Sequence, residues 1–366
     1  MQITIVKDTE GFKDLEKEWD SFLDESGQNN IFLTFDWLYN WWQCFKKDYS
    51  LYIILAKEND KIYGIAPLMI SKRFGFRELR FISSNISDYE DIITSGSTEK
   101  RREIIEIILN KLYESNEWDI FRLNRIRQES PSLSSFDNIV HNRIFANIFL
   151  KQHKEGAPYI KITKTWDDYH SALRKKLVAD TRRQLSKLTK QDANFLFKKI
   201  ENESEISLFL DKLIEFYKLR RKSKHTKCIF DNGLTSSFIK IVADKFFHKG
   251  WLDLSFMEFK GKKVAMHFGF IYRDRFYYFM PVHNNEFYQY SPGRLLLYDL
   301  IHKCFDNHIR QFDFMLGEED YKLDWKTGIE RLYFVTMFQK TLKGSIANQI
   351  LDRLSFNVKK LLGKKW

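Results

Sequence analysis

The stretch from Tyr288 to Phe305 (YQYSPGRLLLYDLIHKCF) contains the residue types that an anion-binding helix start requires. Ser291 fits the N-cap position, Pro292 fits the first helical position, and apolar residues follow at helical spacing. Gly293 leaves backbone N–H groups of the first turn without a covering side chain, and Arg294 adds positive charge. The pattern therefore favours either a phosphate site at a helix N-terminus or an ordinary helix cap.

Pro281 lies in a run that otherwise has the composition of a strand (YYFMPVHN). Because proline cannot donate a hydrogen bond to a sheet, this strand lies at an edge, carries a bulge, or separates from a neighbour. A strand that separates from its neighbour leaves backbone groups free to bind an extended ligand. The sequence thus predicts either a ligand-binding gap beside Pro281 or a simple sheet edge.

Two residues in apolar strands are candidates for a general base. Asp313 lies in QFDFML, where alternation turns it away from the flanking phenylalanines, and a buried carboxylate needs a partner or a function. His267 lies in VAMHFGF and shares its face with the small residues Ala265 and Gly269. The structural alternatives are a hydrogen-bonded carboxylate and a core histidine.

A polar loop follows the Asp313 strand directly. Its sequence is GEEDYKLDW (317–325), and it supplies Glu318, Tyr321 and Lys322 at a strand end, where loops often carry function. The alternative is a solvated turn.

Composition excludes several classes of protein. The chain has 366 residues, of which 43% are hydrophobic and 30% charged, so it is globular rather than disordered. The net charge of +11 favours anionic partners such as nucleotide phosphates, nucleic acid or an acidic membrane surface. No CxxC, GxGxxG, Walker A, HExxH or GxSxG motif is present, which argues against dehydrogenase, P-loop and zinc hydrolase functions and predicts no metal. The start does not resemble a signal peptide and no apolar run is long enough to span a membrane, so we expect a cytoplasmic protein.

The elements that would position these residues occur in the same order in both halves of the chain. In each half, helices precede an antiparallel hairpin, and a helix and a further strand follow. The turn signal at 156–158 (Gly-Ala-Pro) marks a boundary. We predict an α+β fold with domains at 1–155 and 156–366, a strand at 309–316, and a basic C-terminal helix over 346–366.

The motifs, taken in order, resemble those of the GNAT-type acyltransferases linked to cellulose and exopolysaccharide biosynthesis (CelD-like), distant relatives of the FemABX peptidyltransferases. SPGRLL, FDFMLG and YKLDW resemble the family's SPG, DfxxG and YKxxW motifs. FLTFDWLYNWW, GIAPL and SDYEDI resemble its early segments, and ADTRRQLSKL and FYKLRRKSK occur in the expected order. The resemblance covers nearly the whole chain. It implies two tandem GNAT-like domains, each a mostly antiparallel twisted sheet flanked by helices.

The resemblance also implies transfer of an acyl group from a CoA thioester to an amine. The residues it places at the donor are Pro281, Gln289, Ser291, Gly293, Arg294 and Leu295. His267 or Asp313 would take the amine proton, and Tyr321 or Tyr290 would protonate the leaving thiolate. Acceptor binding is assigned to Asp88 and Tyr89 of SDYEDI and to Tyr290, Glu318 and Lys322. The chain departs from the wider superfamily's Q/R-x-x-G-x-G/A loop, of which only Gln289 and Gly293 are present.

The implied acceptor is an amino sugar, a nucleotide sugar or a related cell-envelope precursor, and no DNA partner is expected. One alternative is an aminoacyl-tRNA-dependent peptidyltransferase, which the basic stretch 173–190 allows. Another is a non-catalytic GNAT-like scaffold in polysaccharide biosynthesis. The basic C-terminal segment also allows peripheral contact with the inner face of the membrane, although packing on its own domain is favoured.

Overall fold

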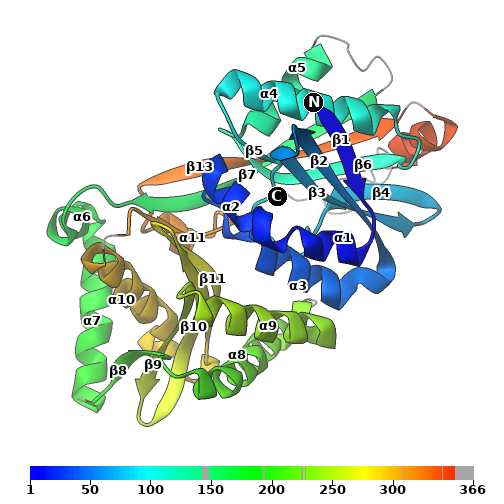
Figure 1. Ribbon diagram of the computed structural model, residues 1–366. Helices are drawn as coiled ribbons and strands as arrows, with labels where there is room; N and C mark the ends of the chain where they lie inside the picture. Colours follow the sequence, from blue (N-terminus) through cyan, green and yellow to red (C-terminus); the bar gives the residue numbers. More distant parts are fainter. Residues whose placement is uncertain are drawn as a thin grey trace. The chain divides into compact units, whose positions relative to one another are not determined.

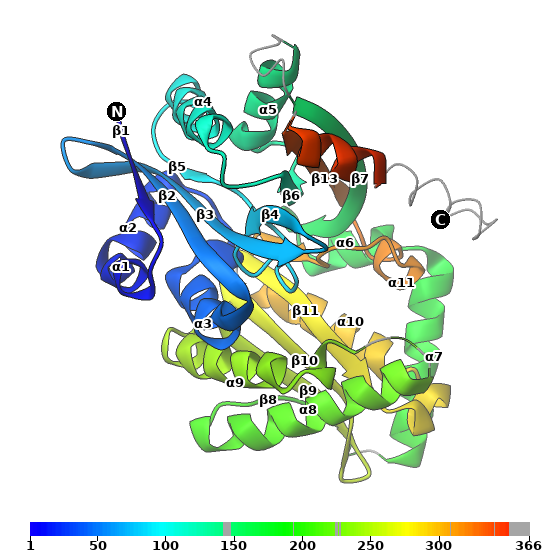
Figure 2. The ribbon, with the colours of Figure 1, turned by 90° about the vertical axis from the view of Figure 1, so that its right-hand side faces the viewer.

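The computed structural model describes residues 1–141, 148–192, 194–223, 226, 228–307, 309–339 and 341–350, with the side chains of 137–141 and 148–153 left out. The chain divides into two compact units (Figures 1 and 2). Unit 1 comprises Met1–Glu155 and the residues from Arg331 on, and unit 2 comprises Gly156–Glu330. Two strands cross this division, β7 (Ile148–Lys161) and β13 (Gly328–Gln339), and each is described with the unit in which it pairs with β12 or β6.

Unit 1 is a mostly antiparallel sheet with helices on both faces. Its strand order is β1-β2-β3-β4-β6-β13, with β5 paired to β3. Helices α4 and α5 cover one face, and α1, α2 and α3 lie on the other (Figure 2). The strands are β1 (Gln2–Val6), β2 (Tyr49–Glu58), β3 (Lys61–Arg73), β4 (Phe76–Phe81), β5 (Ile93–Thr94), β6 (Ile120–Arg127) and β13 (Gly328–Gln339), and the helices are α1 (Thr9–Asp14), α2 (Glu16–Ser26), α3 (Phe35–Phe45), α4 (Thr98–Glu114) and α5 (Pro131–His141).

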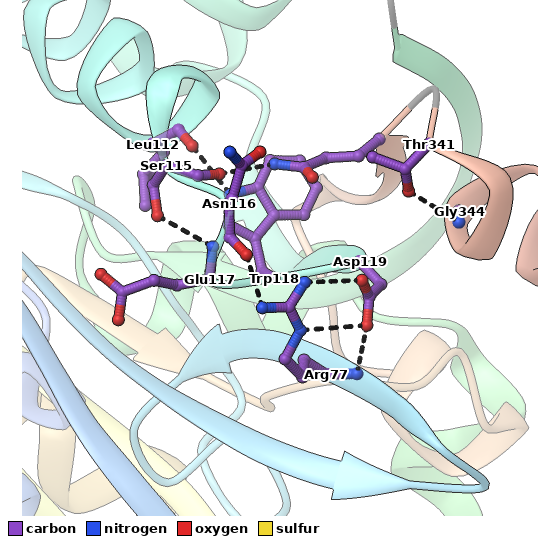
Figure 3. A network of polar contacts seen from close by, with 10 residues as sticks. Arg77, Leu112, Ser115, Asn116, Glu117, Trp118, Asp119, Thr341 and Gly344 are labelled. Carbon is purple, nitrogen blue, oxygen red and sulfur yellow. Dashed lines mark hydrogen bonds and ion pairs between the residues drawn. The ribbon is translucent and has the colours of Figure 1, made fainter.

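A polar network joins three strands of unit 1 (Figure 3). The buried Asp119 carboxylate accepts hydrogen bonds from the Arg77 backbone N–H at 2.8 Å and from the Arg77 guanidinium Nη2 at 2.8 Å. Gln339, at the end of β13, donates its backbone N–H to the Asp119 carbonyl and its side-chain amide to the Ser115 carbonyl at 2.7 Å. These bonds connect β4, the start of β6 and β13, and they explain why the chain beyond Arg331 groups with unit 1.

Unit 2 has the same layered arrangement. Its strand order is β7-β12-β11-β10-β9-β8. Helices α7 and α10 cover one face of β9–β11, and α8 and α9 cover the other (Figures 1 and 2). The strands are β7 (Ile148–Lys161), β8 (Leu196–Lys199), β9 (Leu252–Phe259), β10 (Lys262–Tyr272), β11 (Arg275–His283) and β12 (Gln311–Asp313), and the helices are α6 (Trp166–Ala172), α7 (Lys175–Gln191), α8 (Glu203–Ser223), α9 (Gly233–His248), α10 (Pro292–Asp306) and α11 (Asp320–Leu323).

The predicted repeat is present in the topology. In unit 1 three successive antiparallel strands, β2, β3 and β4, are followed by α4 and by β6, which pairs with β4 in parallel. In unit 2 the strands β9, β10 and β11 are followed by α10 and by β12, which pairs with β11 in parallel. A final antiparallel partner completes each sheet, β13 on β6 and β7 on β12. The predicted α+β fold class is confirmed.

The structure differs from the predicted elements at two places. The strand expected at 309–316 ends at Asp313, for a reason given below. The residues from Arg331 on, predicted to lie in the second domain, group with unit 1 because β13 pairs with β6. Of the expected basic C-terminal helix, residues 346–350 are helical, and 351–366 lie outside the described residues.

Within the described part of the chain, none of the helices has the length and apolar character that crossing a bilayer demands. The same residues contain no group of three or more His, Cys, Asp or Glu side chains arranged to hold a metal ion.

Candidate active site

Strands β11 and β12 begin side by side and then diverge. Their parallel pairing joins Arg275–Tyr277 to Gln311–Asp313, after which β11 continues to His283 while paired with β10. The chain after β12 instead approaches β7, and Phe314 donates its backbone N–H to the Pro158 carbonyl of β7 at 3.0 Å. Pro281 lies in the part of β11 beyond the β12 pairing, where the sheet does not require its missing N–H. The strand therefore separates from one neighbour, as one of the alternatives for Pro281 predicted.

Asp313 stabilises the turn at which the chain after β12 leaves β11. Its Oδ1 atom accepts the Met315 backbone N–H at 2.8 Å, and its Oδ2 atom lies 3.3 Å from Arg275 Nη1. Met315 has a left-handed conformation (φ 66°), so the bond supports a sharp turn immediately after β12. Asp313 is 1% exposed and both of its oxygens are engaged. These contacts give the Asp313 carboxylate a structural role in the turn after β12, in place of the general-base role predicted from the sequence.

A cavity of about 300 Å³ opens between the diverging segments and the start of α10. Its wall is mainly apolar and aromatic, with a few polar groups, as is typical of small-molecule sites. The residues that line it are Arg220, Met266, Tyr278, Pro281, Val282, His283, Tyr288, Ser291, Pro292, Gly293, Arg294, Leu296, Leu297, Tyr321, Asp324 and Trp325. All of them belong to unit 2.

The start of α10 forms one side of the cavity. Ser291 occupies the N-cap position in a left-handed conformation (φ 51°), and its carbonyl accepts the N–H groups of Arg294 and Leu295. Its hydroxyl makes no cap hydrogen bond, because N-cap side chains cap from an extended backbone. A Cβ on Gly293 would lie 3.2 Å from His283 Nδ1, so glycine keeps the helix start close to β11. Helix N-termini favour negative charge, and Arg294 adds to that effect.

The loop after β12 forms the opposite side. Lys322 is 5% exposed, and its Nζ atom donates to the Leu316 carbonyl at 2.7 Å and lies 2.9 Å from Glu319. These contacts hold the loop, so the predicted acceptor residue Lys322 has a structural role. Tyr321 reaches the cavity, and burial, with a smaller effect of the Glu319 charge, raises its pKa. Its phenol therefore stays protonated at neutral pH and can donate a proton.

His267 lies in the core rather than on the cavity wall. It is fully buried, and its ring stacks on those of Phe276 and Tyr278. Its Nδ1 atom is 3.5 Å from the buried Asp253 carboxylate. Burial lowers the pKa of His267, and Asp253 acts in the opposite direction without reversing it. His267 is therefore a core histidine, the structural alternative considered for it. Tyr278, on which the His267 ring stacks, lines the cavity instead.

The remaining predicted site residues are spread over several environments. Leu295 is fully buried in the core below α10, while Gln289 and Tyr290 lie in the turn before α10, near Lys187. Glu318 is exposed and packs over Gly156, where even a Cβ would collide with it.

Asp88 and Tyr89 belong to unit 1. Tyr89 is 1% exposed, and the Arg127 guanidinium lies 4.0 Å from its ring centre. The cavity thus brings together Pro281, Ser291, Gly293, Arg294 and Tyr321 of the predicted set.

Sequence reasoning missed five polar residues of the cavity: Arg220, Tyr278, His283, Tyr288 and Asp324. Arg220 donates to the Pro281 carbonyl at 3.5 Å, and Asp324 forms an ion pair with Arg174. A signal for Arg220 was present in the FYKLRRKSK motif, and His283 follows Pro281 by two residues. Tyr278 and Asp324 had no signal, because only the folded chain brings them to the helix start.

Two larger cavities, of about 590 and 660 Å³, lie elsewhere. The first is a groove between α8 and the β9–β10 hairpin, and the second lies in unit 1 beside Arg77 and Asp119. Neither includes a helix N-terminus beside diverging strands, so the smaller cavity is the better candidate for an anionic, extended ligand.

The corresponding opening of unit 1 is filled by the chain itself. The β4–β6 pairing also covers only three residues on each strand, Glu78–Arg80 and Ile120–Arg122. Beyond it, the buried Glu90 carboxylate accepts the Asn124 N–H at 3.1 Å, and Arg125 donates to the Ser84 carbonyl at 2.8 Å. Unit 1 therefore repeats the topology of unit 2, and these buried polar contacts lie beyond its short parallel pairing.

Glu90 makes the stability of the protein depend on pH. Burial raises its pKa to about 8, with Arg125 opposing the shift. A carboxyl group with a raised folded-state pKa contributes stability that is complete below its unfolded pKa and is lost as pH rises toward the folded value. We expect the free energy of unfolding of the wild type to fall by about 1.4 kcal/mol per pH unit from this group between pH 5 and 8. Urea unfolding across this range measures it.

The variant Glu90→Gln retains an acceptor for Asn124 and removes the ionisation. It should lose this part of the pH dependence and become more stable than the wild type near pH 8. The matched control is Glu114→Gln, an exposed carboxyl group of α4. If Glu90→Gln and the wild type show the same pH slope, Glu90 does not titrate as described.

Residues 175–323 match the model of a family described as an acetyltransferase (GNAT) domain. The matched segment lies within unit 2. The matched segment contains β9–β11, α10, β12 and α11, and thus nearly all of the residues around the cavity. The chain is accordingly an acyltransferase, and its predicted enzyme class is confirmed. No curated protein matches the chain.

Solved structures extend the likeness of the fold to the whole chain. The crystal structure of FemX aligns with a TM-score of 0.64 at 10% identity, covering 96% of this chain and 100% of FemX. A Bacteroides thetaiotaomicron protein of unknown function aligns at 0.57 with 13% identity, covering 92% and 100%. The C-terminal domain of an Agrobacterium fabrum protein assigned as a lysylphosphatidylglycerol synthetase aligns at 0.55 with 10% identity, covering 95% and 97%. At these identities the likeness concerns the fold alone.

Proposed function

We propose that this protein is an acyl-CoA-dependent N-acyltransferase whose donor site is the cavity between β11, the loop after β12 and the start of α10. The observation that carries the proposal is the divergence of β11 from β12 beside a glycine-containing helix N-terminus. A thioester donor is long and narrow, with a phosphate-bearing end, and it needs an open strand edge next to an anion site.

The residues present fit such a donor. Ser291, Gly293 and Arg294 would hold its phosphates at the positive end of α10. The segment of β11 at Pro281–His283 that lines the cavity would hold its extended arm, and the apolar wall at Met266 and Trp325 would exclude water from the reacting end. When bound, the thioester supplies the acyl group.

The chain's own residues would handle the two proton transfers. The acceptor amine is protonated at neutral pH, so a base must take its proton. We assign this role to His283, the histidine of the cavity wall, in place of His267 and Asp313. Tyr321, whose phenol is protonated at neutral pH, would give a proton to the departing thiolate.

The acceptor is proposed to be an amine on a sugar or a related cell-envelope precursor, as the resemblance to CelD-like enzymes implies. The cavity offers the Asp324 carboxylate and the Tyr288 phenol to a polar, protonated amine. Asp324 belongs to the same loop as Tyr321, and Tyr288 belongs to the turn before α10.

Calorimetric titration of acetyl-CoA and longer acyl-CoAs into the full chain tests the donor. We expect binding of one donor per chain, since the matching opening in unit 1 is filled. Release of free thiol in the presence of glucosamine would then test the acceptor class. No binding of any acyl-CoA would refute the proposed donor, whereas binding without thiol release would refute only the acceptor.

An aminoacyl-tRNA donor, the alternative raised by the sequence, gives a different result in the same titration. Its affinity would come from many phosphate contacts and would weaken steeply with salt. Binding of charged tRNA together with failure to bind acyl-CoA would favour that alternative.

Tyr321→Phe tests the proton donor. The change removes one hydroxyl from a side chain at the cavity and leaves its ring in place. We expect donor affinity to stay within about twofold of the wild type and turnover to fall by about 10²-fold, the usual size of a lost general-acid contribution. Tyr63→Phe, at a partly exposed tyrosine of β3 in unit 1, is the matched control. Equal turnover of Tyr321→Phe and the wild type would remove Tyr321 from the mechanism.

A further inference from the structure

The outer face of α7 is a continuous basic surface. The helix has the sequence KKLVADTRRQLSKLTKQ and contains a single acid, Asp180. Its six cationic side chains are all exposed, and they are Lys175, Lys176, Arg182, Arg183, Lys187 and Lys190. Arg183 pairs with Asp180 at 3.0 Å, so five of the six cations have no acidic partner on the helix.

Helical geometry places these cations on one side. Successive residues turn by about 100°, which puts all six within an arc of about 140°. The buried residues Leu177, Thr181 and Leu188 lie on the opposite side of the helix. Within the basic arc the neutral residues are Ala179 and Ser186, so no large side chain interrupts the charge. From Lys175 to Lys190 the face extends for about 23 Å, nearly three Debye lengths at physiological salt.

The C-terminal half of this face ends beside the proposed donor site. Lys187 Nζ lies 3.4 Å from the Gln289 carbonyl and 5.0 Å from the centre of the Tyr290 ring. Both residues belong to the turn that leads into Ser291 and α10. Whatever the basic face binds is therefore held next to the mouth of the cavity.

We propose that α7 docks this enzyme onto an anionic lipid bilayer. The chemistry recognised is a layer of phosphate headgroups, which requires only an extended positive face of low relief. No large apolar side chain lies within the basic arc, so binding is electrostatic adsorption without insertion. Proteins that bind single-stranded nucleic acid combine a positively charged groove with stacked aromatic side chains, whereas this face is convex and its arc contains none. The proposal does not depend on the identity of the acyl donor.

Vesicle co-sedimentation of the full chain tests the proposal. The probes are vesicles of phosphatidylcholine alone and of phosphatidylcholine with 30% phosphatidylglycerol. We expect binding to the phosphatidylglycerol vesicles at 0.1 M salt, loss of binding at 0.5 M salt, and no binding to phosphatidylcholine. Absence of binding to the anionic vesicles at low salt would overturn the proposal, and this result needs no variant.

Charge reversal locates the surface. The triple variant Lys176→Glu, Arg182→Glu, Lys190→Glu changes only exposed side chains away from the cavity. We expect it to bind anionic vesicles more than about tenfold more weakly, since each cation near such a surface contributes severalfold. The matched control, Lys218→Glu, Lys245→Glu, Lys249→Glu, changes the net charge equally at exposed sites on α8 and at the end of α9.

Two outcomes contradict the assignment of α7. Equal loss of binding in both triple variants would mean that net charge, rather than the α7 face, drives adsorption. Polyuridylate RNA is the second probe. Binding of polyuridylate by the full chain, together with no binding to vesicles, would mean that the face binds nucleic acid. Thermal unfolding midpoints of both variants should lie near that of the wild type, because the changed side chains are exposed.

Discussion

Replacing Gly293 by aspartate is expected to weaken acyl-CoA binding by more than about 100-fold. The new carboxylate would lie at the start of α10, where the proposed site holds the donor phosphates. Placing like charges together in a binding site costs several kcal/mol, and about 2.7 kcal/mol corresponds to a factor of 100. The side chain would also reduce the favourable field of the helix N-terminus. Calorimetric titration of acetyl-CoA into the variant measures the loss.

Two further variants separate charge from size and from general effects on folding. Gly293→Ala adds a Cβ 3.2 Å from His283 Nδ1, which needs only a small shift of the imidazole, so we expect a loss of less than about fivefold. Gly233→Asp adds the same carboxylate at the first residue of α9, where a Cβ meets no atom within 4 Å. Its donor affinity should equal that of the wild type. Wild-type affinity in Gly293→Asp would place the donor phosphates elsewhere.

The second large effect is expected in unit 1, from Asp119→Ala. The variant would leave the Arg77 guanidinium and the Arg77 N–H without the carboxylate that they now bind (Figure 3). Breaking a buried ion pair by removing one partner costs about 3–5 kcal/mol. Because Arg77 is about one third exposed and regains some hydration, we expect about 3 kcal/mol, measured as a fall in the free energy of unfolding in urea.

The Lys7–Glu117 pair provides a matched control close to the same network. Its side chains are 51% and 46% exposed, so Glu117→Ala should cost less than about 1 kcal/mol. Similar losses in the two variants would mean that the Arg77–Asp119 pair does not anchor the strands.

The Asp119 contribution should also depend on pH. Burial by itself raises the pKa of Asp119, but the hydrogen bonds and charge of Arg77 outweigh it and lower the pKa below its usual value. A carboxyl group with a lowered pKa contributes stability above its unfolded pKa and loses it as pH falls through the folded value. The difference between wild type and Asp119→Ala should therefore shrink below about pH 4.

The sequence by itself determined the elements whose residues have a regular local pattern. The β9–β10 hairpin and α10 were predictable because alternation, turn residues and the Ser-Pro-Gly start depend on neighbours within a few positions. The same order of elements occurs in the first half of the chain, and this repetition was sufficient to predict the α+β fold class. Pro281 and Gly293 were identified as site residues for the same reason. A proline in a strand removes a hydrogen-bond donor, and a glycine at a helix start leaves backbone N–H groups uncovered, wherever the rest of the chain lies.

Only the tertiary structure decided which polar residues reach the cavity. Alternation placed Asp313 and His267 inside the protein, but their contacts come from distant parts of the chain: Arg275 for Asp313, and Asp253 for His267. Those contacts make Asp313 a turn-forming residue and leave His267 in the core. Conversely, Arg220 and Asp324 line the cavity because α8 and the loop after β12 pack beside β11. Contacts between residues so far apart in sequence leave no periodic pattern in the chain, and folding alone brings them together.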